Sequence, residues 1–597
     1  MAKSTRPLAL ATLAVAAWGA AGGALLVRKA PSPTAEVARG SEDAFASGLQ
    51  PRELPPRQPP IRWTRERAVF RFRHLDAGPH RLEVSVRDHR SPVAVVVGGA
   101  ILARVAVGER QAVIPLARSD SPGLDVELRV EPFLAGDGRR LGTRLERVAI
   151  VRQGPASLRP VLPLLVAIAA LAPFAGAWVS GLALTSALAC GLLSATGFVA
   201  LLWPAGVARS PYAAELAAWL WGAALLAAGF GWLWRLRGRD HRAAAFVAAL
   251  VALLVQGLVV TSPLLVGSDT VFHANKLAAV ARGDLFPTSL TQHDPPFRIP
   301  YGVSFYAALA PLRLTGLDDV TLVRWGAAGA GVAGSLAVFA LASPAGAMAA
   351  ALATVLLQLL PGVVEIHSYG NLSNVFSQAV TAFFVAWWAG RARGGGLVGA
   401  LLLTVAGLGH LSSLIVLGVL APALAVGRYP GIRRDRARLV ALALGGAVLV
   451  LYYAQFWPLV KEQLPRLLAG GEASGSAHPL PGRVLQQIRA ALDQWGAPAV
   501  LLALFGWPRS RASALDRDLA AFWWAGAFLA LVAVVSPLEV RYLYALTVPL
   551  AVAAARGARG LAAQGRGGFW LAALLVGAQL WLALAGIEDA LLHRYRP

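Results

Sequence analysis

The chain has 597 residues, of which 56% are hydrophobic and only 15% charged, and its formal net charge is +23. Soluble domains carry about 25% charged residues, so soluble, disordered and collagen-like chains are excluded. Apolar runs of about 20 residues recur from position 160 onward and predict a multi-pass membrane protein. The one cysteine, Cys190, excludes a disulfide framework and a cysteine zinc site.

The basic residues gather in short turns between the apolar runs. The clusters lie at 235–242, 391–393, 428–438, 509–517 and 556–566. Such turns offer no element that reads a nucleic-acid groove, so we expect no nucleic-acid partner. Basic turns mark the cytoplasmic side of membrane proteins. The sequence therefore predicts a protein of a bacterial-type cytoplasmic (inner) membrane, with the lipid bilayer as a partner.

Residues 1–29 are predicted to form a signal anchor. Basic residues precede the apolar stretch Pro7 to Val27, which is long enough to span the bilayer and would leave the N-terminus in the cytoplasm. Basic residues also follow this stretch, so cleavage near residues 35–38 is the alternative. Residues 30–60 are rich in Pro, Ser and Glu and are predicted to be a linker.

Residues 61–156 change to an alternation of apolar and polar residues that is typical of strands. The pattern predicts an extracytoplasmic β-sandwich, an all-β domain inserted into an all-α polytopic membrane chain. It resembles the jelly-roll modules that bind carbohydrate, and a plain structural domain is the alternative because aromatic residues are few. The predicted strands are 68–73, 81–86, 94–97, 101–107, 111–116, 124–130 and 147–151.

Residues 157–597 are predicted to form the transmembrane domain, with fourteen spans, or fifteen with the anchor. If Ile299 to Gly316 is a helix on the outer surface, all five arginine clusters fall in the cytoplasm. The large outer loops are then 262–316 and 458–496. The predicted spans are 161–179, 182–203, 213–234, 243–262, 321–341, 345–362, 373–390, 395–410, 411–427, 437–457, 497–507, 518–536, 540–555 and 568–587.

The outer loop 262–316 is unusually polar for this chain. Asp269, His273 and Lys276 are spaced i, i+4 and i+7, so a helix after the span would present them on one face. A carboxylate beside an imidazole can act as a general base, bind a metal or hold a diphosphate. A solvated loop with a local ion pair is the alternative.

The surrounding sequence resembles the C-type glycosyltransferase superfamily, whose members use polyprenyl-phosphate sugars. The resemblance covers about residues 243–556. It rests on the runs Gly267-Ser268-Asp269-Thr270-Val271-Phe272-His273 and Ala281-Arg282-Gly283-Asp284-Leu285-Phe286-Pro287. It rests also on Ile299-Pro300-Tyr301-Gly302, on Leu322-Val323-Arg324-Trp325 and on Glu539-Val540-Arg541-Tyr542.

The resemblance implies catalytic roles for Asp269 and His273. Asp269 would deprotonate or orient the acceptor hydroxyl, and Lys276 with Arg541 would neutralise the lipid phosphate. A divalent cation such as Mg²⁺ or Mn²⁺, if one is used, would be held by Asp269 and His273. Other polar residues are predicted on the same outer face as substrate or phosphate ligands, with interfacial anchoring as the alternative: Glu365, His367, Asn371, His410 and Tyr542.

Apolar residues from Val484 to Trp495 follow the spacing of an amphipathic helix. This helix would lie on the bilayer as a lid over a lipid substrate, or would re-enter the membrane without a catalytic role.

The sequence thus leads to one favoured function and two alternatives. The favoured one is an enzyme that transfers a sugar from a polyprenyl-phosphate donor to a glycan, lipid or protein acceptor on the extracytoplasmic face. The first alternative is a transporter or flippase of a lipid-linked glycan, which should show polar residues inside several spans. The second is a non-catalytic scaffold in assembly of the cell envelope.

Overall fold

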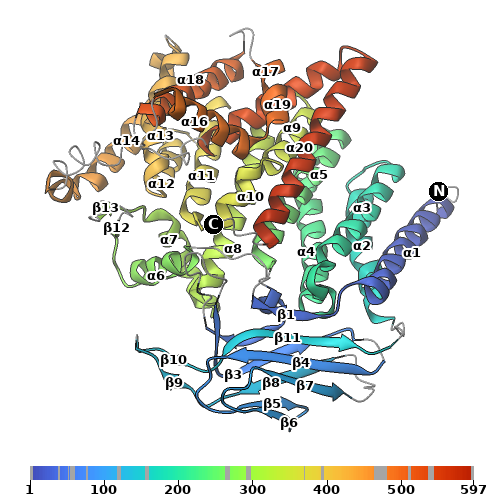
Figure 1. Cartoon of the computed structure of the whole chain (residues 1–597). Helices are drawn as coiled ribbons and strands as arrows, with labels where there is room; N and C mark the ends of the chain where they lie inside the picture. Colours follow the sequence, from blue (N-terminus) through green and yellow to red (C-terminus); the bar gives the residue numbers. More distant parts are fainter. Residues whose placement is uncertain are drawn as a thin grey trace. The chain divides into compact units, whose positions relative to one another are not determined.

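A computed structural model gives the structure of the chain, which divides into two compact units. Unit 1 is Met1–Trp232 with Thr261–Val266 and Leu591–Pro597, and unit 2 is Leu233–Val260 with Gly267–Ala590 (Figure 1). The structure describes residues 5–37, 41–50, 53, 61–75, 78–116, 123–136, 138–154, 160–262, 269–290, 298–368, 370–390, 395–429, 431–462, 480–507, 513–535 and 544–592.

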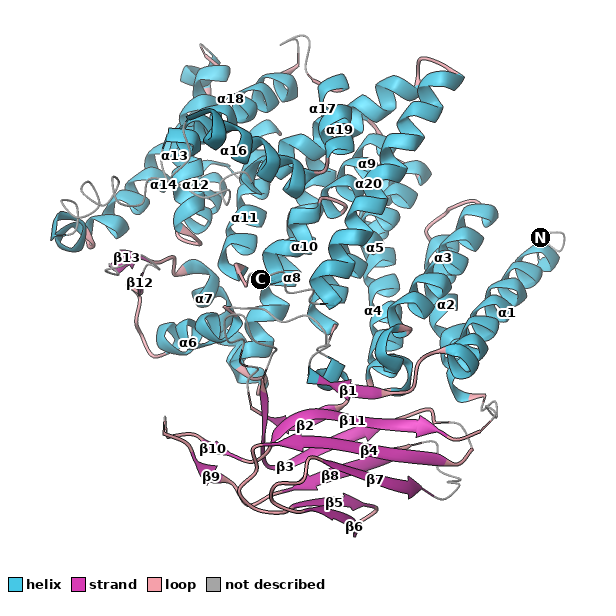
Figure 2. Cartoon of the chain, in the orientation of Figure 1, coloured by secondary structure: helices cyan, strands magenta, loops and turns pink. Residues whose placement is uncertain are grey.

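Unit 1 contains an antiparallel sheet that is nearly closed, in the strand order β6-β5-β8-β3-β11-β4-β7 (Figure 2). The longest strand, β3, pairs with β8 through residues 67–72 and with β11 through residues 62–63, so it belongs to both halves of the sheet. The strands are β1 (Thr34–Glu36), β2 (Ala46–Leu49), β3 (Arg62–Phe72), β4 (His80–Arg87), β5 (Val93–Val97), β6 (Ala100–Val105), β7 (Gln111–Leu116), β8 (Leu124–Arg129), β9 (Phe133–Leu134), β10 (Arg140–Leu141) and β11 (Arg144–Arg152).

Each of the seven predicted strands coincides with a strand of this sheet. Their alternation gives the core, in which Phe70, Phe72, Leu82, Val84 and Val95 are fully buried. Part of the predicted linker also lies in the sheet, because β1 pairs with β11 and β2 pairs with β3. These two edge strands are too short and too poor in large apolar residues to show a period of two.

The helices of unit 1 are α1 (Thr5–Lys29), α2 (Val161–Val179), α3 (Leu184–Leu202) and most of α4 (Tyr212–Leu233). α1 packs against α2 at glycine positions: a Cβ atom on Gly19 would lie 2.7 Å from the Cα of Ala167, and one on Gly23 would clash with Pro163. Such small residues let two helix backbones approach closely. The buried Arg209 donates a hydrogen bond to the Val27 carbonyl near the end of α1 (2.8 Å).

Unit 2 is a helical assembly with one short β-hairpin. The hairpin is β12 (Thr288–Leu290) and β13 (Arg298–Pro300). The helices are α5 (Arg239–Thr261), α6 (Thr270–Ala281), α7 (Ser304–Leu309), α8 (Asp319–Ala342), α9 (Ala347–Gln358), α10 (Pro361–Ser368), α11 (Leu372–Ala389), α12 (Gly395–Gly407), α13 (Leu411–Gly427), α14 (Arg436–Ala454), α16 (Leu480–Trp495), α17 (Ala497–Phe505), α18 (Ala514–Val535), α19 (Thr547–Ala562) and α20 (Arg566–Leu592).

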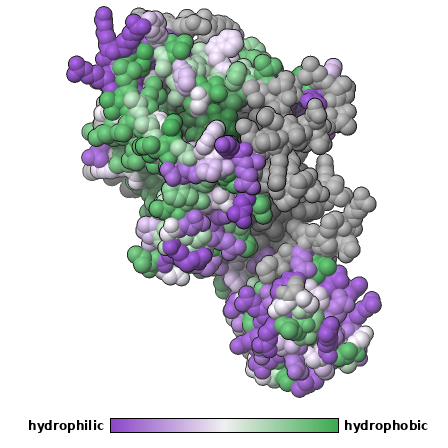
Figure 3. Space-filling model, turned by 90° about the vertical axis from the view of Figure 1, so that its left-hand side faces the viewer, coloured by the Kyte–Doolittle hydropathy of each residue, from purple (hydrophilic) through white to green (hydrophobic). Residues whose placement is uncertain are grey.

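Every predicted span overlaps a helix, but the helices support fewer crossings than fifteen. Among the described residues, eight helices are long and apolar enough to cross a membrane, or nine if α9 and α10 count as one span bent by 40°. α12 and α13 are shorter, and α17 has nine residues. A hydropathy pattern does not reveal such breaks. In the face shown in Figure 3, the helical surface is largely hydrophobic, whereas the sheet is largely hydrophilic.

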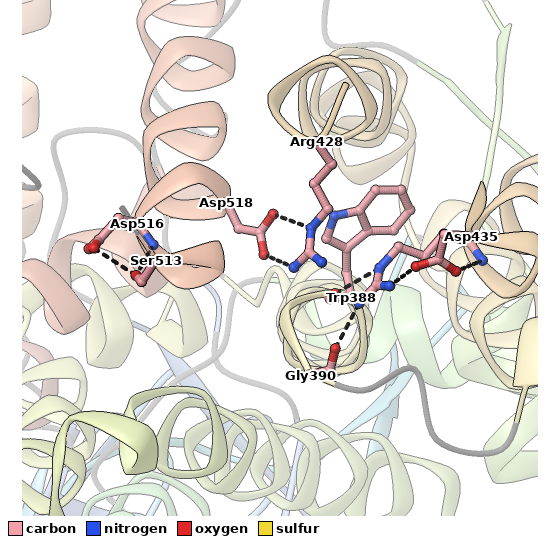
Figure 4. Close-up of polar contacts among 8 residues, drawn as sticks. Trp388, Gly390, Arg428, Asp435, Ser513, Asp516 and Asp518 are labelled. Carbon is pink, nitrogen blue, oxygen red and sulfur yellow. Dashed lines mark hydrogen bonds and ion pairs between the residues drawn. The ribbon is translucent and has the colours of Figure 1, made fainter. Parts of the chain in front are cut away.

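Two of the arginines in the predicted cytoplasmic clusters join helix ends (Figure 4). Arg428, just after α13, forms a two-bonded ion pair with Asp518 in the first turns of α18, and its Nε lies 2.9 Å from Asp518 Oδ1. Arg438 in α14 donates to the carbonyls of Trp388 (3.0 Å) and Gly390 (2.7 Å) at the end of α11. These guanidinium groups therefore connect helices: Arg428 connects α13 to α18, and Arg438 connects α14 to α11.

Candidate functional site

Asp269 stands directly before α6 and against the turn between α10 and α11. Its side chain is exposed, and its carbonyl accepts the amide of His273 (3.0 Å), which continues α6 backward to Asp269. Gly370 of the turn adopts a φ of +68°, and a Cβ atom there would lie 2.5 Å from the Asp269 nitrogen. A side chain at position 370 would therefore displace Asp269.

His273, four residues after Asp269, is buried in α6, with 1% of its surface exposed. Its Nδ1 lies 2.7 Å from the Tyr306 hydroxyl, and the ring also bonds to the Gly370 backbone. Burial lowers the pKa of His273 to about 4, and the bond to Gly370 opposes this only in part. α6 is not one of the helices that could span a membrane. His273 is therefore neutral at pH 7, and its ring bonds to the glycine that packs against Asp269.

The three side chains predicted to share a helix face have different environments. Asp269 is exposed, His273 is buried, and Lys276 donates its ammonium to the Thr288 carbonyl (2.6 Å) at the start of the hairpin. Burial lowers the pKa of Lys276, which Asp284 partly offsets. Lys276 therefore holds the hairpin to α6.

Aromatic rings continue the network from His273 toward His410. The Tyr301 ring lies 6.4 Å from the Tyr306 ring and meets the His410 ring at 6.0 Å and 84°. The Tyr301 hydroxyl is 3.3 Å from the hydroxyl of Ser373 in α11. The structure thus brings His273 and His410, which are 137 positions apart in the sequence, within ring-contact distance of one tyrosine, Tyr301.

His410 caps the N-terminus of α13. Its Nδ1 accepts the backbone N–H of Ser412 (3.2 Å), and a backbone N–H only donates, so the neutral ring carries its proton on Nε2. The Ser412 hydroxyl reaches Asn374 Oδ1 (3.3 Å). Asn374 is fully buried, and its Nδ2 has no hydrogen-bond partner within the described part of the chain. The cap to α13 therefore fixes the orientation of the His410 ring.

His367 lies in a second, inner network of polar side chains. It is 3% exposed and donates from Nε2 to Gln256 Oε1 (2.9 Å). The series of hydrogen bonds continues from Gln256 Nε2 to Gln358 Oε1 (3.0 Å) and from Gln358 Nε2 to the Ser335 hydroxyl (2.5 Å). The Ser335 hydroxyl in turn donates to the Gly331 carbonyl (2.8 Å). The network joins α5, α8, α9 and α10. Single Gln and Ser residues in apolar runs gave no signal for it in the sequence.

The remaining predicted residues have less defined roles. Glu365 and Asn371 are half-buried, the first on α10 and the second just before α11. Arg541 and Tyr542 lie outside the described residues. Within the described ranges no group of three His, Cys, Asp or Glu side chains could hold a metal ion. His273 is a poor metal ligand here, because its ring is bonded to both Tyr306 and Gly370.

Searches for relatives add no assignment. No protein-family profile and no curated protein sequence matches the chain.

Proposed function

We propose that the chain is a membrane glycosyltransferase that moves a sugar from a polyprenyl-phosphate donor to an acceptor hydroxyl on the extracytoplasmic face. One observation carries the proposal. The exposed Asp269 packs against Gly370 in the turn between α10 and α11, and the buried His273 bonds to the backbone of the same glycine and to Tyr306. The resemblance to the C-type glycosyltransferases and the apolar helices that suit a lipid donor support it further.

The chemistry follows from these groups. Asp269 takes the proton of the acceptor hydroxyl, whose oxygen attacks the anomeric carbon of the sugar. The bond from that carbon to the phosphate oxygen breaks, and polyprenyl phosphate leaves with the electron pair. Cationic groups, Arg541 and Lys276 as the resemblance implies, neutralise the charge that develops on the leaving phosphate. The sheet of unit 1 is proposed to be a jelly-roll-like module outside the membrane.

The purified protein in lipid nanodiscs tests this proposal. A panel of polyprenyl-phosphate sugars is incubated with it, and release of polyprenyl phosphate is followed with and without candidate acceptors. Transfer of the sugar to an acceptor supports the proposal, and no release from any donor contradicts it.

A flippase of lipid-linked glycans is the second candidate. The buried chain from His367 to Ser335 and the bend between α9 and α10 favour it, because carriers place polar groups at broken helices inside the membrane. A flippase moves the lipid across liposome bilayers without cleaving it. Movement without cleavage, lost in Gln256→Leu, would favour this second function.

A further inference from the structure

A cavity of about 30 Å³ lies within unit 2 against the inner polar network. Its lining includes six neutral polar side chains. Tyr544 and Thr547 are two of them, and the other four are each no more than 5% exposed: Gln256, Ser335, Gln358 and Gln378. Its remaining walls come from α8, α9, α10 and α11 and from residues 544–548. The space holds about two water molecules, since one needs about 10–15 Å³.

The hydrogen bonds of the inner network leave some donors and acceptors of these glutamines unused. Each glutamine amide has two N–H donors and an oxygen with two lone pairs. Gln256 donates one N–H to Gln358, and Gln358 donates one N–H to Ser335. A second N–H donor therefore remains on each of these two cavity-lining amides. A buried amide group without a partner costs about 1–3 kcal/mol. A polar cavity of this size is therefore expected to be wet, whereas an apolar cavity stays dry.

Gln378 connects the cavity to the hydrogen bonds around His410. Its Nε2 donates to Asn374 Oδ1 (3.4 Å) and to the Ser413 hydroxyl (3.2 Å), and Asn374 is the residue reached by Ser412 from His410. Gln256 connects the cavity to His367 on the other side. A ligand that bonds to Gln378 and to Gln256 or Gln358 would join the two histidines in one hydrogen-bonded path.

The lining also selects the kind of ligand. The described lining residues include no Asp, Glu, Lys, Arg or His, and burying an unpaired charge among them would cost far more than burying a neutral polar group. We infer that the cavity is a binding site for water, or for a single neutral hydroxyl group, that bridges Gln378 to the Gln256–Gln358 pair. The inference does not depend on the proposed function.

Radiolytic footprinting in H₂¹⁸O tests the inference on the unmodified protein in nanodiscs. Bound water generates hydroxyl radicals in place, so ¹⁸O should enter the cavity-lining Leu357 and Val363 although they are only 7% and 3% exposed. The matched controls are Phe339 and Phe384, which are fully buried and do not line the cavity. Labelling of the lining residues at least 5-fold faster than the controls is expected.

A variant separates bound water from general flexibility. Ala382→Leu places a larger apolar side chain on the cavity wall and should reduce the labelling of Leu357 and Val363 to the control level. Ala353→Leu, at a buried position away from the cavity, should not. If the wild-type lining residues are labelled no faster than the controls, or if labelling persists unchanged in Ala382→Leu, the cavity is dry or the labelling has another source, and the inference is wrong.

Discussion

Gly370 packs so closely against Asp269 that the Asp269 backbone leaves no room for a side chain at position 370. The site therefore depends on a glycine at the turn between α10 and α11 as much as on the acidic residue before α6.

Gly370→Ala should accordingly reduce sugar transfer by 10-fold or more. The added Cβ atom strains a φ of +68° and pushes the Asp269 nitrogen away. Gly329→Ala is the control, because no atom lies within 4 Å of its Cβ position. Initial rates of polyprenyl-phosphate release check the prediction, and equal rates for the two variants would mean that the position of Asp269 does not matter.

His273 should make stability depend on pH. Its folded pKa of about 4 lies below its ordinary value of 6.5, so the unfolded chain binds an additional proton between these values. This contribution is fully present above pH 6.5 and is lost as the pH falls toward 4, by roughly 3 kcal/mol in all. Thermal melts at pH 7.5 and pH 5 measure it.

The variant His273→Asn should flatten this pH dependence, while His241→Asn, at a half-buried position near the start of α5, should retain it. A melting temperature of His273→Asn that falls with acid as steeply as that of the wild type would assign the effect to another group.

Asp518→Asn should destabilise unit 2 by about 3–5 kcal/mol, because it leaves the guanidinium of Arg428 without its carboxylate partner in a buried place. Asp319→Asn breaks the more exposed pair with Arg313 and should cost less than about 1 kcal/mol. Chemical unfolding in detergent compares the two. Similar losses would show that burial of the Asp518 pair is not what matters.

Gly19→Leu should separate α1 from α2, because its side chain would enter the backbone of α2 at Ala167. Gly197→Leu on α3 is the control, with open space at its Cβ position. Cysteine pairs introduced across α1 and α2 should cross-link in the control and not in Gly19→Leu. Equal cross-linking would contradict the close packing of the two helices.

The sequence predicted the strands well and the site only in part. Alternation along β3, β4 and β8 identifies strands because one face of each is buried. Asp269 and His410 stood out as polar residues at helix ends. The turn at Gly370 and the pairing of His273 with Tyr306 did not, because they depend on contacts between segments far apart in the chain.

The sequence pattern also did not predict where α9 gives way to α10. Gln579 in α20 donates to the Leu359 carbonyl (2.8 Å), where α9 gives way to α10, and to the Trp495 carbonyl (3.0 Å) at the end of α16. One glutamine thus joins two breaks that hydropathy alone does not detect. The second of these bonds joins the end of α16, the predicted amphipathic helix, to α20.

The proposed catalytic role of Asp269 is tested most directly by single-turnover sugar transfer from a polyprenyl-phosphate donor. Two variants are compared, Asp269→Asn and Asp284→Asn, and each removes a carboxylate from an exposed position within residues 269–290. Asp269→Asn keeps the size of the side chain and removes its basicity, so its rate should fall on the order of 100-fold or more. Asp284→Asn should stay within about 3-fold of the wild type. A folded Asp269→Asn protein that transfers sugar at the wild-type rate would contradict the assignment.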